Sequence, residues 1–596
     1  MEAGTVTAAE ASTGSKTMAD LIVLAAQKHG DRTAIKHKVG DQWVDVSYGQ
    51  MGETVKQVAL GLIELGIEPG DKVSILSNTR PEWTYAQFGI LAAGATTVSI
   101  YQTNSPQECH YVLSHSESRA VFVEDLEQLD KIRQIRNELP KLEFVIVFDP
   151  PAGGASDAIA LSTLMERSAE ADESQFSERV NGVSRDDVCL YIYTSGTTGP
   201  PKGCILTHGN YRDVTTMTES QGVLTGDELV YLFLPLAHAF ALLIQFVTFD
   251  LGSAIAYWEK DPQKIVPNLM ELKPTYFPSV PRIFEKIYTL ATSNAPDRDA
   301  LDRAVKLGFK VRLADVRGEE VSPEERAAFE KADQELFVNV RNLFGGRIRQ
   351  AVTGAAPIAR EILEFFYACG VPVMEGYGMT ETSTVASANS IDDFRFGSVG
   401  RPLPGVEAKV AEDGELLLKG SNIFKGYFKN EQATKETLED GWLHTGDLAT
   451  IDEDGYIYIT GRKKDIIITA GGKNITPANL ENGLKQNRWI SQAVVVGDRR
   501  PYLVALITLD PEEVPAFAEM HGLEPAQVRD SEQMRAEIQK TVDKVNDEVG
   551  RVEQIKKFTI LPHDLSQETG ELTPTLKVKR NVVAEKCAGD IESLYA

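Results

Sequence analysis

A loop rich in glycine and hydroxyl side chains, residues 193–203, constrains this 596-residue chain more than any other stretch. It reads Tyr-Thr-Ser-Gly-Thr-Thr-Gly-Pro-Pro-Lys-Gly and directly follows the apolar run Val188–Ile192. Glycines let backbone N–H groups approach an anion, hydroxyls donate hydrogen bonds, and a lysine adds positive charge. A strand followed by such a loop predicts a polyphosphate-binding site, although the spacing is not that of Walker A. A surface linker is the alternative, but linkers rarely sit directly behind an apolar strand.

Charge and cysteine content limit the partners of the chain. Its 61 basic and 87 acidic residues give a net charge of −26, which argues against nucleic acid and against electrostatic docking on anionic lipid. Five scattered cysteines without a Cys-x-x-Cys pair predict a reducing compartment, the cytoplasm, and no structural zinc. Small anionic ligands stay allowed, because they need only a local basic pocket.

The uncharged stretch 229–249 is long enough for a membrane span. However, Pro235, His238 and Gln245 lie inside it, and no basic cluster flanks it. We therefore predict a buried strand, a proline-containing turn and a helix that is apolar all round. The prediction is no transmembrane span, with peripheral membrane contact left open.

Alternating strand and helix patterns predict an α/β fold with doubly wound, mostly parallel sheets. Helical stretches separate four β-rich runs, which are Val73–Leu76, Ala95–Ile100, Ala120–Val123 and Phe144–Phe148. Two later runs, Arg347–Thr353 and Val371–Glu375, each continue into a glycine-bearing turn. Ligands of such sheets bind beyond the carboxyl ends of the strands, so these turns can converge on one crevice.

Changes in residue composition and in strand and helix pattern along the chain predict the domain organisation. Residues 1–16 lack an apolar core and are expected to be a disordered leader. Residues 17–461 form a large N-terminal domain, with a charged helical insertion at about 296–342 and a β-rich subdomain after about residue 398. The polar break 462–465 is predicted to be a hinge, and residues 466–596 a small, mobile α+β domain.

Taken in order, the turns of the chain resemble the adenylate-forming superfamily of acyl-CoA synthetases, peptide-synthetase adenylation domains and insect luciferases. The resemblance spans about residues 20–590 and rests on a series of seven turns: 193–203, 234–238, 353–357, 376–382, 441–447, 461–465 and 572–580. Within the superfamily the chain is most similar to the long-chain fatty acid–CoA ligases. Their features include the stretch Val280–Lys286, the ending Leu-Thr-Pro-Thr-Leu-Lys and the charged insertion.

This resemblance implies a two-step ligase that uses ATP, Mg²⁺ and CoA. A fatty acid carboxylate attacks the α-phosphorus of ATP to give acyl-adenylate and pyrophosphate, and the CoA thiol then displaces AMP. Both steps build negative charge on oxygen, so catalysis should depend mostly on positioning and charge stabilisation.

The resemblance also implies the site residues. The phosphates would bind the loop and its lysine, Mg²⁺ would bind Thr194 and Glu381, Tyr377 would face the adenine, and Asp447 and Arg462 would reach the ribose. The full nucleotide-binding set is Thr194, Ser195, Gly196, Thr197, Thr198, Gly199, Lys202, Gly354, Ala355, Ala356, Gly376, Tyr377, Gly378, Thr380, Asp447, Arg462 and Lys464. Purely structural roles stay open for Glu381, Tyr377 and Asp447.

Three residues are implied in catalysis: Lys577, His238 and Thr380. Lys577 would enter the site for adenylation, although Lys579 and Arg580 are alternatives and Leu576 replaces the usual glycine before it. His238 would lie near the acyl carboxylate, unless it is a core histidine. The uncharged run that follows it would then form a wall of the acyl pocket.

Lys464 occupies the hinge position about which the family's C-terminal domain is thought to rotate between the two steps. After rotation, the loop Ile468–Pro477 would help to form the CoA tunnel. Many members carry a lysine where this chain has Ile466-Ile467-Ile468, which leaves the CoA contacts open.

Three rival functions stay open at this point. They are a fatty acyl-AMP ligase that delivers to a carrier protein, a ligase for an aromatic or medium-chain acid, and a fatty-acid trapping module without turnover. The joint presence of Lys202, Glu381, Asp447 and Lys577 argues against the trapping module, because pure binding does not need them.

Overall fold

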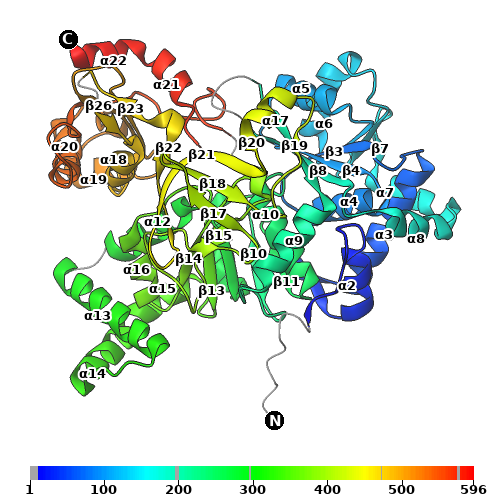
Figure 1. The fold of residues 1–596 in the computed structure, drawn as a ribbon, viewed down its shortest axis with the longest axis horizontal. Helices are drawn as coiled ribbons and strands as arrows, with labels where there is room; N and C mark the ends of the chain where they lie inside the picture. The colour runs from blue at the N-terminus through cyan, green and yellow to red at the C-terminus, as the bar shows by residue number, and fades with distance from the viewer. Residues whose placement is uncertain (1–10, 195–199, 294–296, 471–472, 574–576) are drawn as a thin grey trace.

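Three sheets form the body of the molecule up to Arg462, and a smaller unit of helices and short sheets follows it (Figure 1). The computed structural model describes residues 11–194, 200–293, 297–470, 473–573 and 577–596. Two of the sheets are large, mixed and mainly parallel, with helices packed on them, which confirms the predicted α/β class.

The first large sheet has eight strands in the order β19-β9-β8-β4-β3-β5-β6-β7. Strands β3 to β8 pair in parallel, while β9 and β19 are antiparallel additions at one edge. The four predicted β-rich runs are all confirmed as its strands. Its strands are β3 (Lys72–Leu76), β4 (Thr96–Ile100), β5 (Ala120–Val123), β6 (Phe144–Val147), β7 (Ile159–Ala160), β8 (Val188–Thr194), β9 (Lys202–Thr207) and β19 (Gly426–Tyr427). The helices of this part of the chain are α3 (Tyr48–Glu64), α4 (Pro81–Ala92), α5 (Pro106–Ser116), α6 (Leu126–Ile135), α7 (Leu161–Arg167) and α8 (Glu173–Gly182).

The second large sheet has nine strands in the order β16-β15-β14-β13-β12-β10-β11-β1-β2. Its strands are β1 (Thr33–Val39), β2 (Gln42–Ser47), β10 (Leu229–Leu232), β11 (Ala254–Tyr257), β12 (Tyr276–Ser279), β13 (Gln350–Thr353), β14 (Val373–Tyr377), β15 (Ser387–Ala388) and β16 (Arg401–Pro402). The two predicted strands exist with shifted bounds, since β13 starts later and β14 runs on to Tyr377. The helices of this part are α2 (Leu21–His29), α9 (His208–Glu219), α10 (Ala239–Asp250), α11 (Ile265–Leu272), α12 (Pro281–Ser293), α15 (Val338–Leu343) and α16 (Arg360–Ala368).

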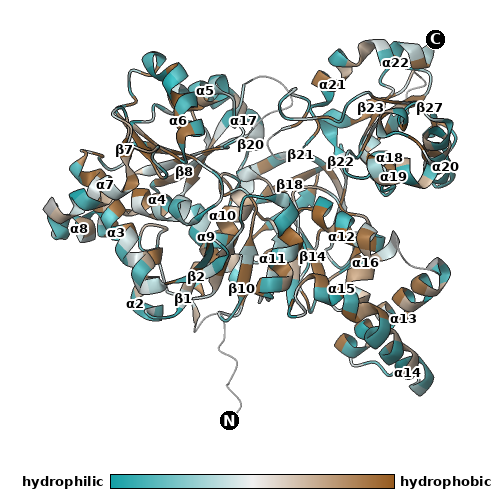
Figure 2. Cartoon of the chain, turned by 180° about the vertical axis from the view of Figure 1, so that it is seen from behind, coloured by the Kyte–Doolittle hydropathy of each residue, from teal (hydrophilic) through white to brown (hydrophobic). Residues whose placement is uncertain are grey.

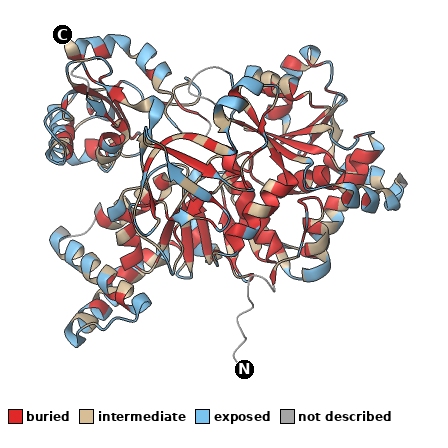
Figure 3. Ribbon diagram, in the orientation of Figure 1, coloured by how far each residue is buried: buried red, intermediate tan, exposed pale blue. Residues whose placement is uncertain are grey.

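The uncharged stretch 229–249 folds as predicted, into strand β10, a turn and helix α10. Helix α10 lies in the middle of the molecule and is buried on nearly every side (Figures 1 and 3). This position explains why it is apolar all round. No helix in the described ranges has both the length and the apolar character to cross a bilayer.

Residues 11–16, the described part of the predicted disordered leader, are ordered. Residues 11–16 pack against the body of the N-terminal domain, while the first ten lie outside the described residues. The Ser12 hydroxyl donates to Asp250 Oδ2 at 2.6 Å, and the Thr13 backbone N–H donates to the Asp250 carbonyl at 3.0 Å. Composition could not predict this, because the anchor lies at the far end of α10.

The charged insertion is helical, as predicted, and forms a projecting arm (Figure 1). It comprises α13 (Arg298–Arg317), α14 (Pro323–Ala332) and a π-helical turn that leads into α15. Much of its surface is hydrophilic (Figure 2), but Val311 and Phe337 are fully buried against the core of the second sheet. The insertion is therefore anchored to the N-terminal domain.

A third, antiparallel sheet and a short helix connect the large sheets to the C-terminal unit. They are β17 (Glu407–Val410), β18 (Glu415–Lys419), α17 (Glu431–Thr437), β20 (Leu438–Glu439), β21 (Trp442–Ile451) and β22 (Ile457–Arg462). The C-terminal unit has apolar clusters of its own. Its elements are β23 (Ile467–Ile468), β24 (Asn474–Ile475), α18 (Pro477–Leu484), β25 (Ile490–Val496), β26 (Leu503–Leu509), α19 (Val514–His521), α20 (Glu532–Asp547), β27 (Ile555–Ile560), α21 (Arg580–Lys586) and α22 (Ala588–Tyr595).

Candidate active site

The predicted site residues gather where strands of all three sheets end. Strands β8, β13 and β14 end at Thr194, Thr353 and Tyr377, each at the start of a predicted turn. Strands β13 and β14 are parallel neighbours, with Thr353 beside Glu375. Their turns therefore leave the same edge of the sheet, as expected for a doubly wound fold.

A buried aspartate from the third sheet joins Tyr377 at this edge. Asp447 Oδ2 accepts a hydrogen bond of 2.6 Å from the Tyr377 hydroxyl, and Oδ1 accepts one of 2.9 Å from Arg462 Nε. Asp447 and Arg462 are direct partners across the β21–β22 hairpin, which fixes their contact. Burial, and then the nearby Asp447 carboxylate, raise the pKa of Tyr377 well above its usual range. The three side chains thus form one network with a buried, two-oxygen acceptor at its centre.

The two turns that flank this network pack backbone against backbone. A Cβ at Gly378 would lie 1.8 Å from the Thr384 carbonyl oxygen, and one at Gly354 would lie 3.0 Å from that of Gly376. Only glycine fits at Gly378 without moving the chain. Ala355, beside Gly354, has a left-handed φ of 67°. The turns are therefore tightly built, with small residues facing the strand ends.

Glu381 lies buried in the next turn, a short 3₁₀ segment at residues 380–382. The Cys204 thiol interacts with both Glu381 and the predicted ligand Thr194: burial, and then the Glu381 charge, raise its pKa well above the usual range, whereas a hydrogen bond with Thr194 lowers it. Glu381 Oε1 accepts a hydrogen bond of 2.6 Å from the Tyr427 hydroxyl. Sequence reasoning missed Tyr427, because a tyrosine in an apolar, glycine-bearing stretch has no distinctive chemical pattern.

Lys202 begins strand β9, the antiparallel neighbour of β8, and its ammonium lies over the Tyr427 ring, with Nζ 4.8 Å from the ring centroid. The predicted phosphate-binding residues between the two strands, 195–199, lie outside the described residues. Both ends of the loop, Thr194 and Lys202, nevertheless lie close to Glu381 through Cys204 and Tyr427.

His238 caps the first turn of α10, where its Nδ1 accepts a hydrogen bond of 3.2 Å from the Phe240 backbone N–H. Burial, and then the positive charge of Lys577, lower the pKa of His238 to about 4. The side chain is therefore neutral near pH 7. Because Nδ1 is an acceptor, the neutral ring carries its proton on Nε2 and can donate there.

Lys577 approaches the same groups from the C-terminal unit. Its backbone is held by the bridge between the neighbouring Val578 and Leu572 and by a 2.8 Å hydrogen bond from the Thr573 N–H to the Lys577 carbonyl. The Lys577 side chain is exposed to solvent, but neighbouring protein atoms reduce its solvation. This loss of solvation, and then the charge of Arg462, lower the pKa of Lys577, whereas the charges of Asp447 and Glu381 raise it.

These couplings show that Lys577 lies within electrostatic range of Asp447, Glu381, Arg462 and His238. Residues from both units therefore meet at one site. The alternative candidate Arg580 is engaged elsewhere, in an ion pair with Glu481 of its own unit.

Ion pairs join the two units away from the site. Arg282 and Lys286, on helix α12 of the N-terminal domain, pair with Asp510 and Glu512, which lie between β26 and α19. The Lys286–Glu512 distance is 2.5 Å. These contacts involve the stretch Val280–Lys286 and hold the units in the arrangement that brings Lys577 inward.

The predicted hinge residue Lys464 is exposed and forms no hydrogen bond or ion pair with the described residues. Its neighbour Lys463, in contrast, pairs with Asp413 at 2.6 Å and Glu415 at 2.9 Å. The structure therefore does not bring Lys464 into the network at Asp447, and its role at the hinge stays a prediction.

The donor set fits Mg²⁺ in a particular way. The described residues contain no cluster of three or more His, Cys, Asp or Glu side chains able to hold a metal ion alone. Glu381 and Thr194 offer two hard oxygen donors, and Mg²⁺ commonly takes one or two protein ligands together with phosphates and water. The residues present thus fit a magnesium ion that arrives with a nucleotide.

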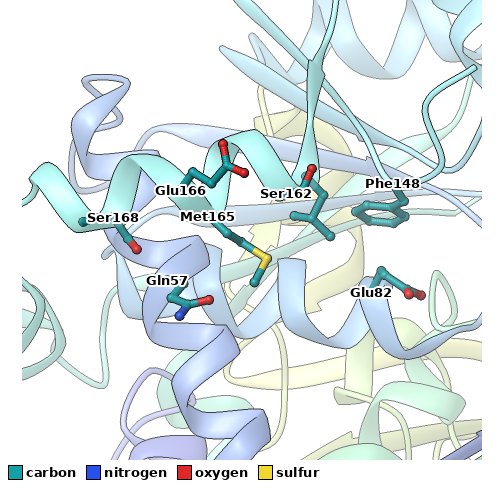
Figure 4. A pocket seen from close by; sticks show the side chains of 9 residues that line it. Gln57, Glu82, Phe148, Ser162, Met165, Glu166 and Ser168 are labelled. Atoms are coloured by element: carbon teal, nitrogen blue, oxygen red, sulfur yellow. The ribbon is translucent and has the colours of Figure 1, made fainter. Parts of the chain in front are cut away.

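A shallow groove on the first domain lies apart from this site (Figure 4). Helices α3 and α7 line it with residues such as Gln57, Ser162, Met165 and Glu166. None of the predicted site residues lines it, so we assign it no role.

Comparisons with known proteins agree with this geometry. The family model of AMP-binding enzymes matches residues 23–428, and that of the AMP-binding enzyme C-terminal domain matches residues 464–596. The long-chain-fatty-acid–CoA ligase FadD15 of Mycobacterium bovis is 40% identical over 564 residues, which cover 93% of this chain and 92% of that protein. The long-chain-fatty-acid–CoA ligase ACSBG1 of Homo sapiens is 33% identical, with 96% and 84% covered.

Solved structures show the same fold. The adenylation domain of a carboxylate reductase from Mycobacterium chelonae aligns with a TM-score of 0.78 at 22% identity, over 99% of this chain and 92% of that one. ATP-bound MatB from Rhodopseudomonas palustris aligns with a TM-score of 0.70 at 24% identity, over 96% and 99% of the two chains. With both family models matched in order along its length, the chain belongs to the family of AMP-binding enzymes.

Proposed function

We propose that this chain is an ATP-dependent, AMP-forming fatty acid–CoA ligase that acts on long-chain acids. The observation that carries the proposal is the electrostatic coupling of Lys577, from the C-terminal unit, to Asp447, Glu381 and Arg462 of the N-terminal domain. A binding module needs no such convergence of charges. The relatives at 33–40% identity, named as long-chain-fatty-acid–CoA ligases, support the substrate class.

In the first step, the N-terminal domain would bind ATP. Asp447 and Arg462 suit the ribose hydroxyls, because the buried carboxylate has lone pairs beyond those used by Tyr377 and Arg462. The Tyr377 ring and the tight turns at Gly354–Ala356 and Gly376–Gly378 suit the adenine. The loop 194–199 and Lys202 suit the leaving pyrophosphate.

The reacting centre would lie between Lys577 and His238. Negative charge that develops on the carboxylate and the α-phosphate would be stabilised by the Lys577 ammonium. The neutral His238 can donate from Nε2 to the acyl carboxylate. Thr380, buried next to Glu381, is positioned at the same edge. The buried, uncharged helix α10 would then present an apolar wall to the acyl chain.

Mg²⁺ would be held by Glu381 and Thr194 and would neutralise phosphate charge during the first step. For the second step, rotation about Lys464 would withdraw Lys577 and bring residues 468–477 to the site for CoA. We also propose a cytoplasmic location, on the composition argument given above.

A substrate panel tests the proposal. Purified protein with ATP, Mg²⁺, CoA and palmitate should release AMP and pyrophosphate and form palmitoyl-CoA. Octanoate and benzoate, tested in parallel, should react more slowly. Pyrophosphate without thioester would instead indicate a fatty acyl-AMP ligase, faster reaction with benzoate or octanoate would overturn the long-chain assignment, and fatty acid binding without pyrophosphate would overturn the enzyme.

A further inference from the structure

A buried tyrosine, Tyr427, separates two charges that the proposed reaction needs. Its hydroxyl donates to Glu381 Oε1 at 2.6 Å. The face of its ring meets the Lys202 ammonium, with Nζ 4.8 Å from the centroid. The side chain is 8% exposed. The reaction proposed above gives it no role, although it contacts one group assigned to metal binding and one assigned to phosphate binding.

The backbone holds Tyr427 in this place from several sides. Strand β19 pairs with β9, so that Tyr427 lies opposite Cys204, two residues after Lys202. The Phe424 N–H donates to the Glu381 carbonyl at 2.9 Å, which ties the same segment to the glutamate's turn. The Tyr427 N–H donates to Thr434 Oγ1 at 2.9 Å. The tyrosine is therefore fixed relative to both charges.

This arrangement prevents a competing contact. A lysine and a glutamate close together tend to pair, and such a pair would occupy the groups that a nucleotide and its metal ion need. Within the described residues no ion pair joins Lys202 to Glu381; the Tyr427 hydroxyl bonds one carboxylate oxygen, and its ring gives the ammonium another partner. The Tyr427 hydroxyl thus binds Glu381 through Oε1, and the Lys202 ammonium is held on the ring and not at the carboxylate.

We propose that Tyr427 is a positioning residue that holds Glu381 and Lys202 apart, the first directed to Mg²⁺ and the second to the nucleotide phosphates. The inference rests on the proposed ATP-dependent function. The two parts of the side chain have separate roles: the hydroxyl orients the Glu381 carboxylate, and the ring holds the Lys202 ammonium. A tyrosine that only stabilised the fold would not have two separable effects on ATP binding.

Two substitutions separate the parts. Tyr427→Phe removes the hydroxyl and keeps the ring, whereas Tyr427→Leu removes both. Phe424→Leu is the matched control, because the Phe424 ring is also buried and packs on Tyr427 with centroids 4.9 Å apart. Calorimetric titration with ATP is carried out twice, once in Mg²⁺ and once with a chelator in place of the metal ion. Fatty acid and CoA are left out, so the titration measures ATP binding without turnover. Thermal unfolding of each variant records its stability.

We expect Tyr427→Phe to weaken ATP binding in Mg²⁺ about tenfold, the usual effect of losing a hydrogen bond to a charged group, with metal-free binding within about twofold of wild type. Tyr427→Leu should weaken binding under both conditions. Phe424→Leu should lower the melting temperature without changing either affinity.

Two outcomes would overturn the inference. If Tyr427→Phe binds ATP in Mg²⁺ with the affinity of the wild-type protein, the hydroxyl does not position Glu381. Losses by all three variants that follow their melting temperatures would show a structural brace. In both cases the proposed function would stand as long as the wild-type protein releases pyrophosphate. If the wild-type protein binds no ATP, both proposals are overturned.

Discussion

In the N-terminal domain, Asp447 and Glu381 are buried and hydrogen-bonded, whereas Lys577 belongs to the C-terminal unit and is exposed to solvent. Asp447 has two fixed donors, and Glu381 has the Tyr427 hydroxyl. In contrast, the Lys577 ammonium forms no hydrogen bond or ion pair with the described residues. The two sides of the site are thus held by different means.

This difference indicates a division of labour. The nucleotide side is part of the domain core, so its geometry is set when the domain folds, and this pre-organisation favours binding and charge stabilisation. The lysine side is held by contacts between units, including the ion pairs of α12 with Asp510 and Glu512. A group held in this way can be withdrawn without unfolding either unit, as two successive reactions at one site require.

The largest effect should follow from removing the Lys577 charge. Lys577→Ala should lower the rate of acyl-adenylate formation about 10²–10³-fold, since one charge-stabilising donor is lost. Thioester formation from supplied acyl-adenylate should change little. Pyrophosphate release and single-turnover thioester formation measure the two steps. Lys579→Ala is the matched control and should keep both; a large loss there, or equal losses in both steps for Lys577→Ala, would contradict the assignment.

On the pre-organised side, Asp447→Asn should raise the KM for ATP about tenfold or more, because the carboxylate proposed to accept the ribose hydroxyls is replaced by an amide. The effect on kcat should be smaller than that of Lys577→Ala. Tyr377→Phe is the companion variant, since it removes one donor to Asp447 but keeps the ring that would face adenine. An unchanged KM for ATP in Asp447→Asn would remove the aspartate from the nucleotide site.

The framework of this site could be predicted from the sequence, because its residues follow apolar runs that form parallel strands. Thr194 and Tyr377 end β8 and β14, and parallel strands bring such ends to one edge. The buried, uncharged character of α10 was likewise predictable from its composition. Local pattern suffices where a residue's role depends on the strand or turn that carries it.

Contacts between distant segments could not be predicted. Tyr427 meets Glu381 only because β19 adds to the edge of the first sheet, far along the chain from β9. The packing of residues 11–16 depends on Asp250 in the same way. The choice of Lys577 over Arg580 needed the ion pair that occupies the arginine. All of these contacts join residues that are far apart in the sequence, so no local sequence pattern predicts them.

The pH dependence of the first step tests the environment of Lys577. Its pKa is lowered from the usual lysine value by loss of solvation and by Arg462. Because the proposed role of Lys577 requires its protonated form, the rate should be present at lower pH and fall as pH rises through this lowered pKa, about tenfold per pH unit beyond it. Lys577→Arg, if active, should shift the fall to higher pH.

The acid side of the same profile tests His238. Because its pKa is lowered to about 4, the ring should stay neutral and produce no change in rate at the ordinary histidine value. Pyrophosphate release followed from about pH 5 to about pH 10 covers both groups. A fall in rate at mildly acid pH that disappears in His238→Asn would contradict the buried environment described here.

The smallest expected effect comes from the ion pairs between the units. Lys286→Gln should slow acyl-adenylate formation about two- to fivefold, since an exposed pair contributes only ~0.2–1 kcal/mol. The difference should shrink at high salt, which screens exposed charges. Glu512→Gln should act alike, and the double variant should add little, because both remove the same contact. The control is Lys310→Gln, which breaks the exposed Lys310–Glu325 pair within the helical arm.

Thioester formation from supplied acyl-adenylate should be unchanged or faster in Lys286→Gln, since the unit is easier to rotate. Equal slowing of both steps would show that α12 stabilises the fold and not one arrangement of the units.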